Sequence, residues 1–284
     1  MFQEIAPLTF YNEFYIKTPT EGCYFLYFQD GSILLNHENQ LLIPRFSDLK
    51  ENSRKFMAHS TYLFSIDKRE YYLIDENSIS LDGIDREILE LSHISLIREL
   101  EPMWVSFAAS CGIQLHHFYR SNKFCGSCGT PMEKSERERA MVCPSCKNTI
   151  YPRLSPAVIV GIIHEDKILL TKYAGREYVR YALVAGYTEF GETLEETVKR
   201  EVLEEVGLRV KNITYYKNQP WPFSDSLLVG FWAELDGSPQ ITLDETELST
   251  AVWMKAEDIP NDYTQLSLTH EMILKFKNGD GPFQ

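Results

Sequence analysis

The 284-residue sequence lacks long apolar runs and recognisable targeting segments. No stretch approaches the roughly 18 consecutive apolar residues that a membrane-spanning helix requires. The N-terminal segment MFQEIAPLTFYNEF has neither the basic start nor the continuous apolar centre of a signal peptide. The C-terminal GPFQ matches no known address. These absences predict a cytoplasmic protein that does not enter a membrane.

The sequence also lacks an excess of positive charge. It has 28 Lys and Arg residues against 41 Asp and Glu residues, a formal net charge of −13. Such a charge repels phosphate backbones and anionic lipids, which argues against a general nucleic-acid or membrane-binding surface. Repeats and low-complexity segments are missing too. With 44% apolar and 24% charged residues, the composition is that of a folded protein, and the length predicts about two domains or two plus a small module.

Cysteine is scarce, and most of it is clustered. Four of the six cysteines form two C-x2-C pairs, Cys125/Cys128 and Cys143/Cys146. In a reducing cytosol this spacing favours a tetrahedral zinc site over a pair of disulfides or a redox motif. Cys23 and Cys111 have no nearby partner in the sequence and are expected to be ordinary buried residues.

The cysteine pairs divide the chain into three predicted domains. Residues 1–121 contain short aromatic and β-branched runs followed by a helical stretch near 85–117, which predicts an α+β domain. Residues 122–153 form the zinc ribbon. Residues 154–284 begin with two strands that a turn separates, continue through further strands, and end in a helix. The expected class is α/β, with a ribbon and an α+β domain in front.

One helix carries an unusual density of acid. Its start is marked by Thr193 with Glu196 three residues later, a capping-box pattern, and its end by Gly207. An apolar stripe recurs every four residues at Leu194, Val198, Val202 and Val206. At about 100° per residue, three carboxylates share one sector beside this stripe: Glu201, Glu204 and Glu205.

Two interpretations of this acidic sector are open. It is either a solvated acidic face or a site for a divalent cation, which relieves the repulsion between neighbouring carboxylates. Only Lys199 and Arg200 lie near as basic partners. Clustered carboxylates suit Mg²⁺ or Mn²⁺, which often bridge protein acids to substrate phosphates. Gly186 and Gly191 allow the preceding loop to turn tightly and to bring backbone close to such a metal.

The segment NQPWPFSDSLL, residues 218–228, places Trp221 between Pro220 and Pro222. Two prolines exclude a helix interior and a central strand, so the segment is predicted to be a stiff loop. Its aromatic residues either staple the loop to a core or form a surface for a flat ligand.

The acidic segment resembles the Nudix box. Gly186, Glu192 and the run 200–208, REVLEEVGL, fill every fixed position of that motif. The resemblance implies an α/β/α sandwich with a mixed sheet that hydrolyses nucleoside diphosphate derivatives with Mg²⁺ or Mn²⁺. It implies that Glu201, Glu204 and Glu205 are catalytic metal ligands, beside the backbone of Gly186. Glu205 lies closest to the apolar stripe, where desolvation raises its proton affinity, and is expected to be the indispensable carboxylate. Arg200 is expected to orient a box carboxylate rather than to touch substrate.

Further features are similar to the NADH pyrophosphatases of the NudC type. These are the four-cysteine ribbon, the segment 151–153 after it, and an array that runs from Gln219 to Ser226. Ser224 departs from the family, which has proline there, and Asn218 stands where serine is common. The two departures put strict dinucleotide preference in question.

This second resemblance implies the substrates and their contacts. NADH or NAD⁺ would give a nicotinamide mononucleotide and AMP, and NAD-capped RNA would be left with a 5′-monophosphate. The implied substrate contacts are Tyr151, Ile159, Tyr187, Gln219, Trp221, Phe223 and Ser226. Glu247 resembles a further metal ligand, with Asp244 and Glu245 as competitors. The family implies a homodimer with a composite active site, in which the residue after Gly186 reaches the other subunit's site.

Two other readings remain open. The chain could be a Nudix hydrolase for another substrate, such as ADP-ribose or a dinucleoside polyphosphate, because a fold alone does not fix a substrate. It could also be a binding protein, either a zinc-ribbon nucleic-acid module or a nucleotide sensor on an inactive scaffold. Release of AMP from NADH with Mg²⁺ separates the enzymes from the sensor.

Overall fold

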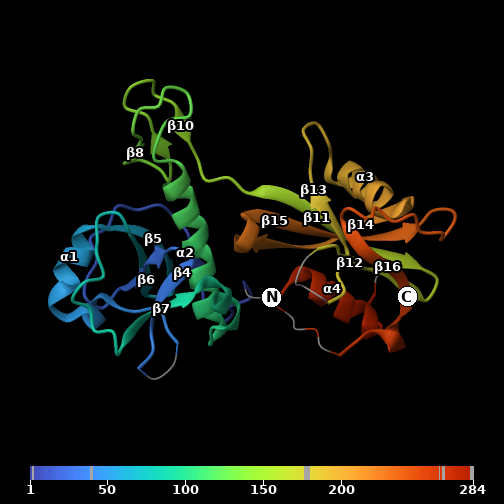
Figure 1. Ribbon diagram of the computed structural model, residues 1–284, viewed down its shortest axis with the longest axis horizontal. Helices are drawn as coiled ribbons and strands as arrows, with labels where there is room; N and C mark the ends of the chain where they lie inside the picture. The colour runs from blue at the N-terminus through green and yellow to red at the C-terminus, as the bar shows by residue number, and fades with distance from the viewer. Residues whose placement is uncertain (2, 39–40, 176–179, 262, 264–265, 282–284) are drawn as a thin grey trace. The chain divides into compact units, whose positions relative to one another are not determined.

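The computed structural model describes residues 1, 3–38, 41–175, 180–261, 263 and 266–281. The chain divides between Arg153 and Leu154 into two units, coloured blue to green and yellow to red in Figure 1. We call Phe2–Arg153 the N-terminal unit and Leu154–Gln284, with Met1, the C-terminal unit. No helix in the described residues is both long enough and apolar enough to cross a membrane.

The N-terminal unit is built from two small sheets, ordered β1-β5-β6-β2 and β3-β4-β7, and a long helix. The strands are β1 (Phe10–Tyr11), β2 (Tyr24–Leu26), β3 (Phe28–Gln29), β4 (Ser32–Asn36), β5 (Ser60–Ile66), β6 (Arg69–Ile74) and β7 (Leu89–His93). The helices are η1 (Phe46–Asn52), α1 (Ser53–Ala58), η2 (Ile94–Glu99) and α2 (Met103–Ser121). Buried aromatic side chains such as Phe25, Phe46 and Tyr72 form its core, which accounts for the aromatic runs in the sequence. The α+β class is confirmed.

The helical stretch expected near 85–117 was partly wrong. Leu89–His93 is strand β7, which pairs antiparallel with β4, and α2 begins only at Met103. The segment forms a strand because its pairing with β4 completes a three-stranded sheet. Local periodicity does not reveal such a pairing. Pro102 then marks the helix start, since the residue before a proline is disfavoured in helical conformation.

The ribbon forms the end of the N-terminal unit. It contains three two-residue strands in the order β10-β9-β8. They are β8 (Glu133–Lys134), β9 (Met141–Val142) and β10 (Thr149–Ile150).

The C-terminal unit contains one mixed sheet of six strands. The order is β14-β15-β11-β12-β16, with β13 also paired to β11. The strands are β11 (Ser155–His164), β12 (Lys167–Tyr173), β13 (Val184–Tyr187), β14 (Val210–Trp221), β15 (Ser226–Leu235) and β16 (Leu248–Lys255). β11 and β15 run parallel, and the other pairs are antiparallel. Residues 157–162 of β11 are buried on both faces, as their continuous apolar character predicts.

Helices cover both faces of this sheet. α3 (Leu194–Val206) packs its valines against one face, and α4 (Leu268–Lys277) packs Met272 and Ile273 against the other (Figure 1). A one-turn segment, η4 (Ala256–Asp258), precedes α4. The predicted α/β/α sandwich with a mixed sheet is therefore confirmed.

The stiff loop expected at residues 218–228 was also partly wrong. β14 continues through Pro220 to Trp221, and only η3 (Pro222–Ser224) leaves the sheet before β15 returns. β14 tolerates proline because it lies at the edge of the sheet, where one side of the strand needs no hydrogen-bond donor. The segment is thus the end of a β-hairpin.

Candidate functional site

The acidic helix α3 has the bounds that its sequence predicts. Thr193 caps it: the side chain accepts a hydrogen bond from the Glu196 backbone, while the Glu196 side chain accepts one from the Thr193 backbone. Gly207 ends the helix in the left-handed conformation, with φ of 68°. Val198, Val202 and Val206 are fully buried against the sheet. This packing fixes which way the neighbouring carboxylates point.

The three box glutamates of α3 differ in exposure. Glu205 is 3% exposed and Glu201 is 9% exposed, whereas the side chain of Glu204 is 59% exposed. Two carboxyl groups are therefore held in a nearly dry region beside the sheet, and the third lies at its rim. A charged group in such a place costs free energy unless a cation or hydrogen-bond donors compensate it.

Arg200 is the only compensating cation that hydrogen-bonds to the box carboxylates in the described residues. Its Nη1 donates to Glu201 at 2.7 Å and to Glu204 at 3.0 Å. Its Nε and Nη2 donate to the two oxygens of Glu192 at 2.5 and 2.9 Å, a bidentate pair. Nη2 also donates to the backbone oxygen of Tyr187 at 2.8 Å. Arg200 thus ties the end of β13, the loop and the helix together.

The pKa values of the acids follow this arrangement. Hydrogen bonds from Arg200 lower the pKa of Glu192 to about 2. Burial, together with the charges of Glu201 and Glu247, raises the pKa of Glu205 to about 8. Burial also raises the pKa of Glu201, although Arg200 opposes the shift. In the metal-free chain, Glu205 therefore retains its proton near neutral pH.

The backbone of Gly186 and the carboxyl group of Glu201 are in close contact. A Cβ atom on residue 186 would overlap the carboxyl group of Glu201. The glycine of β13 is needed here for close approach to an acid on α3. The sequence predicted that Gly186 brings backbone to the metal, and the structure shows which side chain uses that space.

The candidates for a fourth acidic ligand lie between β15 and β16. Thr246 donates two hydrogen bonds to Asp244, at 2.6 and 2.9 Å, and these lower the pKa of Asp244. The charge of Glu247 is among the largest influences on the pKa values of both Glu201 and Glu205, and that of Asp244 is among those on Glu205. This favours Glu247 as the additional ligand.

The chemistry of this group fits a divalent cation. The Glu205 Oε2 atom is buried and has no hydrogen-bond partner among the described residues, as expected of an oxygen reserved for an ion. The box acids are nevertheless more widely spaced than the cysteines. Within the described ranges, the four cysteines are the only group of three or more His, Cys, Asp or Glu whose ligand atoms all lie within 4.8 Å of one another. Arg200 holds Glu201 and Glu204, and repulsion keeps carboxylates apart.

Four of the predicted substrate contacts come together at the end of the β14–β15 hairpin. Trp221 pairs with Ser226 in the strand register, and the ring of Phe223 lies edge-on to that of Trp221 at 5.2 Å. The Tyr187 hydroxyl is 3.2 Å from Ser226 Oγ. Tyr187 is half exposed, and Trp221 and Phe223 are partly exposed. Tyr187, whose backbone oxygen accepts a hydrogen bond from Arg200, therefore lies at the start of an aromatic surface.

The other three predicted contacts lie elsewhere. Gln219 is fully buried, and its side chain accepts a hydrogen bond from Leu268 N and donates one to Leu266 O, which joins β14 to the start of α4. Ile159 is 2% exposed in the core beneath α4. Tyr151 belongs to the N-terminal unit, where its hydroxyl donates to Glu138 at 2.8 Å. Their contact with substrate stays a prediction.

Sequence reasoning assigned no role to Glu192 beyond its fixed position in the box. Its carboxylate accepts from Arg200 and from Thr197 Oγ1, at 2.9 Å, and so holds the loop against α3. The sequence does contain one signal for this structural role. Glu192 stands at a fixed position of the box, and no metal contact was attributed to it.

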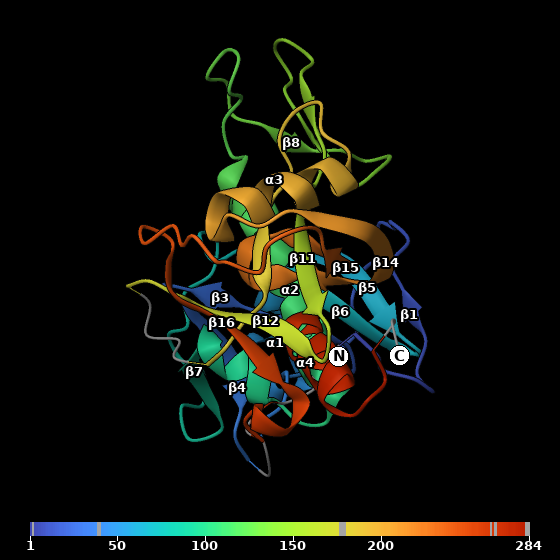
Figure 2. The same ribbon diagram turned by 90° about the vertical axis from the view of Figure 1, so that its right-hand side faces the viewer.

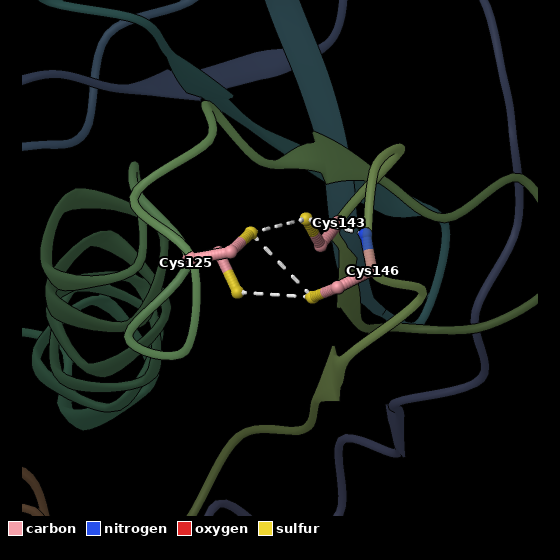
Figure 3. Close-up of side chains that lie close together, drawn as sticks. Cys125, Cys143 and Cys146 are labelled. Carbon is pink, nitrogen blue, oxygen red and sulfur yellow. Dashed lines mark hydrogen bonds between the residues drawn. The ribbon is translucent and has the colours of Figure 1, made fainter.

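The ribbon brings its four cysteines into one cluster (Figure 3). The Sγ atom of Cys128 lies 3.5 Å from the Sγ atom of Cys143 and 3.6 Å from that of Cys146. Disulfide sulfurs lie about 2.05 Å apart, and all four thiols are free. A tetrahedral zinc ion with Zn–S bonds of about 2.3 Å separates its sulfurs by about 3.8 Å, close to the distances here. Backbone hydrogen bonds lower the pKa of Cys125 to about 6, which favours the thiolate. The cluster fits one structural zinc ion.

Comparisons with known proteins agree with these two sites. The sequence pattern of the NUDIX domain matches residues 153–274, and that of the NADH pyrophosphatase zinc ribbon domain matches residues 120–151. Proteins named NAD-capped RNA hydrolase NudC, from Salmonella typhi and Salmonella heidelberg (strain SL476), are each 47% identical over 152 residues. These alignments cover 54% of this chain and 59% of each relative, so the chain matches about three fifths of their length.

Among solved structures, a NUDIX hydrolase from Nitrosomonas europaea is 26% identical, with a TM-score of 0.48. It covers 55% of this chain, and the match includes 91% of that protein. A complete box on α3 and a four-cysteine ribbon are thus matched by two adjoining domain patterns. Residues 153–274 therefore form a Nudix domain, and residues 120–151 in front of it match the zinc ribbon domain of NADH pyrophosphatases.

Proposed function

We propose that this chain hydrolyses the pyrophosphate bond of NADH and NAD⁺, giving reduced or oxidised nicotinamide mononucleotide and AMP. We propose the same reaction at the 5′ end of NAD-capped RNA, which would leave a 5′-monophosphate. The observation that carries the proposal is the position of Arg200. Its guanidinium joins the box carboxylates to the backbone of Tyr187, whose ring begins the aromatic surface.

Mg²⁺ or Mn²⁺ would be held by Glu201, Glu204, Glu205 and Glu247, close to the backbone of Gly186. Such an ion supplies neutralisation of the pyrophosphate charge and activation of water. The orphaned Glu205 oxygen and the space at Gly186 support this ligand set.

The protein's own contribution is placement. Arg200 holds Glu201 and Glu204 through Nη1, so both carboxylates start from fixed positions. A nearby cation would favour the ionised form of Glu205, whose pKa is about 8 without it. Glu205 would then be a buried carboxylate able to accept a proton from water.

The aromatic surface supports a substrate with a flat heterocycle. Trp221 and Phe223 are held edge to face, and Tyr187 is fixed to Ser226 through its hydroxyl. Stacking on such rings suits nicotinamide and adenine alike, and it tolerates different bases. The Ser224 hydroxyl lies 2.9 Å from Ser226 Oγ. The residue that departs from the family pattern therefore adds a polar group to this surface.

Product analysis tests the function directly. NADH, ADP-ribose and NAD-capped RNA are incubated side by side with the full chain and Mg²⁺, and the products are separated by mass. The proposal expects AMP from NADH and 5′-monophosphate RNA from capped RNA, with slower cleavage of ADP-ribose. Faster cleavage of ADP-ribose would favour the other Nudix substrates. Binding of NADH without cleavage by either metal would favour the sensor.

We also propose that the chain is a homodimer with a composite site. Phe190 lies in the box loop and is as exposed as an isolated residue, at 106%, and Tyr187 is 51% exposed. Exposed aromatic side chains beside a site point to a partner surface. Light scattering of the unmodified chain and of the Phe190→Ser variant tests this. A monomeric mass for the unmodified chain would refute the dimer.

A further inference from the structure

The N-terminal unit has a hollow of its own, with a volume of about 920 Å³. Ligand pockets typically measure roughly 300–1,000 Å³. We call it the hairpin pocket, because residues at the tip of the β5–β6 hairpin line it. Strand β1 lies beside this hairpin (Figure 2). The lining of the pocket includes Tyr11, Tyr24, Arg45, Asp67, Lys68 and Arg69. None of these residues takes part in the sites described above.

Tyr24 and Arg45 form one part of the lining of the hairpin pocket. Tyr24 stacks on the fully buried Tyr71, with ring centroids 5.2 Å apart and planes 23° from parallel. Arg45 lies over the Tyr24 ring at 4.9 Å and donates to its hydroxyl at 2.8 Å. These contacts hold the guanidinium of Arg45 in place over the Tyr24 ring.

The hairpin tip supplies two more cations. Arg69 lies over the Trp104 ring at 4.7 Å, which holds its guanidinium in place. Lys68 is exposed, and no side chain in the described part of the protein pairs with its ammonium group. Tyr11 is 45% exposed on the neighbouring strand. A free cation and a free aromatic ring therefore lie in one pocket with two cations that are already held in position.

Among the described residues of the lining, Asp67 is the only acid, and its carboxylate is already engaged. Asp67 accepts a hydrogen bond from the Thr9 backbone at 2.8 Å, and its carboxylate is 3.8 Å from Arg69. Asp67 thus fastens the tip to the segment before Tyr11. Three cations against one engaged carboxylate leave the pocket net positive, in a chain whose net charge is −13.

A buried polar atom belongs to Tyr71, which stacks behind Tyr24 and does not itself line the pocket. The Tyr71 hydroxyl has no hydrogen-bond partner among the described residues, although the side chain is fully buried. The charges of Arg69 and Arg45 act on it and oppose the upward shift that burial gives the pKa of Tyr71.

We propose that the hairpin pocket binds a nucleotide, with Arg45, Lys68 and Arg69 at the phosphate and the exposed ring of Tyr11 against the base. Arginine suits phosphate because its fork of donors matches the oxygens, and tyrosine faces stack on any base. The nucleotide is either free or part of single-stranded RNA, since both present the same chemistry. This inference goes beyond the proposed function and does not rest on it.

The test is a binding measurement on the full chain, without added Mg²⁺ and with Glu205→Gln to prevent turnover. The probes are a labelled six-nucleotide single-stranded RNA with a 5′-monophosphate, followed by fluorescence polarisation, and AMP, followed by calorimetry. The pocket variant is Lys68→Ala/Arg69→Gln. The matched control, Arg54→Gln/Lys55→Ala, removes the same charge from α1, outside the lining. Lys68→Ala alone is the second variant, because Lys68 has no structural contact to lose.

The proposal expects the pocket variant to bind at least tenfold more weakly than the control, and Lys68→Ala to bind severalfold more weakly. The loss of phosphate contacts should also reduce the salt dependence of RNA binding. A loss for RNA alone identifies a chain of RNA as the ligand, and a loss for both probes identifies a nucleotide in either form. Equal affinities for the pocket variant and the control, or no binding of either probe by the parent chain, would overturn the proposal. Because the assay needs no turnover, its outcome is independent of the proposed enzyme activity.

Discussion

The carboxyl group of Glu201 occupies the space that a Cβ atom on residue 186 would fill. Gly186 of β13 and Glu201 of α3 are thus in direct contact beside the candidate metal site. The strand residue must be glycine if the acid is to stay where it is.

Gly186→Ala should therefore abolish activity with little loss of stability. The atoms that a methyl group meets are the end of a flexible side chain, so Glu201 can move away cheaply, but it then leaves the site. A displacement of about 1 Å can cost about 100-fold in rate. We expect at least that loss in the release of AMP from NADH, with an unchanged circular dichroism spectrum. Gly126→Ala is the control, because its Cβ meets no atom within 4 Å. Full activity of Gly186→Ala would show that Glu201 need not occupy this place.

Arg200→Lys should lower activity by about 10- to 100-fold, the usual cost of losing a residue that orients metal ligands. Lysine keeps the charge but cannot reach Glu192, Glu201 and the Tyr187 backbone together as the guanidinium does. The measurement is kcat and KM for NADH, with exposed Lys199→Ala as the neighbouring control. Equal activity of the two variants would contradict the role given to Arg200.

The metal-free chain should lose stability as the pH rises. The pKa of Glu205 is about 8 in the folded chain and near its ordinary value of 4.5 when unfolded. Between these values the folded chain holds a proton that the unfolded chain has released, so its free energy of unfolding falls with pH. Between pH 5.5 and 7.5 the fall should be about 2 to 3 kcal/mol.

Urea unfolding without added Mg²⁺ measures this change. Glu205→Gln, which cannot ionise, should not show that part of the fall, and Mg²⁺ should reverse it at pH 7.5 in the unmodified chain. The same pH dependence in both proteins would remove Glu205 as its source.

The ribbon should hold one zinc ion per chain, and Cys143→Ser should lose it. Structural zinc contributes folding free energy directly, so the variant should melt at a lower temperature and aggregate. Zinc content by mass spectrometry and thermal melting are the measurements. Cys111→Ala removes a thiol outside the ribbon and should keep the metal. Full stability of a zinc-free Cys143→Ser chain would speak against a structural role.

The features that the sequence predicted correctly depend on local signals. Thr193, Glu196 and Gly207 mark the ends of α3 because caps act within one turn of the helix. The four cysteines predict their cluster because each pair lies on one tight turn. The complete box predicts that its acids lie on one face of α3, since a helix has a fixed period.

The features that it missed depend on distant partners. Pro220 predicts a loop from the sequence alone, and only the sheet order shows that it lies in an edge strand, β14. The sequence of Leu89–His93 predicts a helix, and only its pairing with β4 shows that it is a strand. The hydrogen bonds of the Gln219 amide to residues almost 50 positions away were not predicted either, whereas its contact with substrate stays a prediction. Such pairings are set by tertiary structure and leave little trace in local periodicity.

The most direct test of the site is diffraction from crystals soaked with Mn²⁺. Anomalous scattering locates Mn²⁺ independently of any assumption about the ligands. The account predicts at least one peak about 2.2 Å from carboxylate oxygens of both Glu201 and Glu205, with Glu204 or Glu247 completing the set. Well-ordered α3 carboxylates with no anomalous peak among them, at Mn²⁺ concentrations that support hydrolysis of NADH, would contradict it.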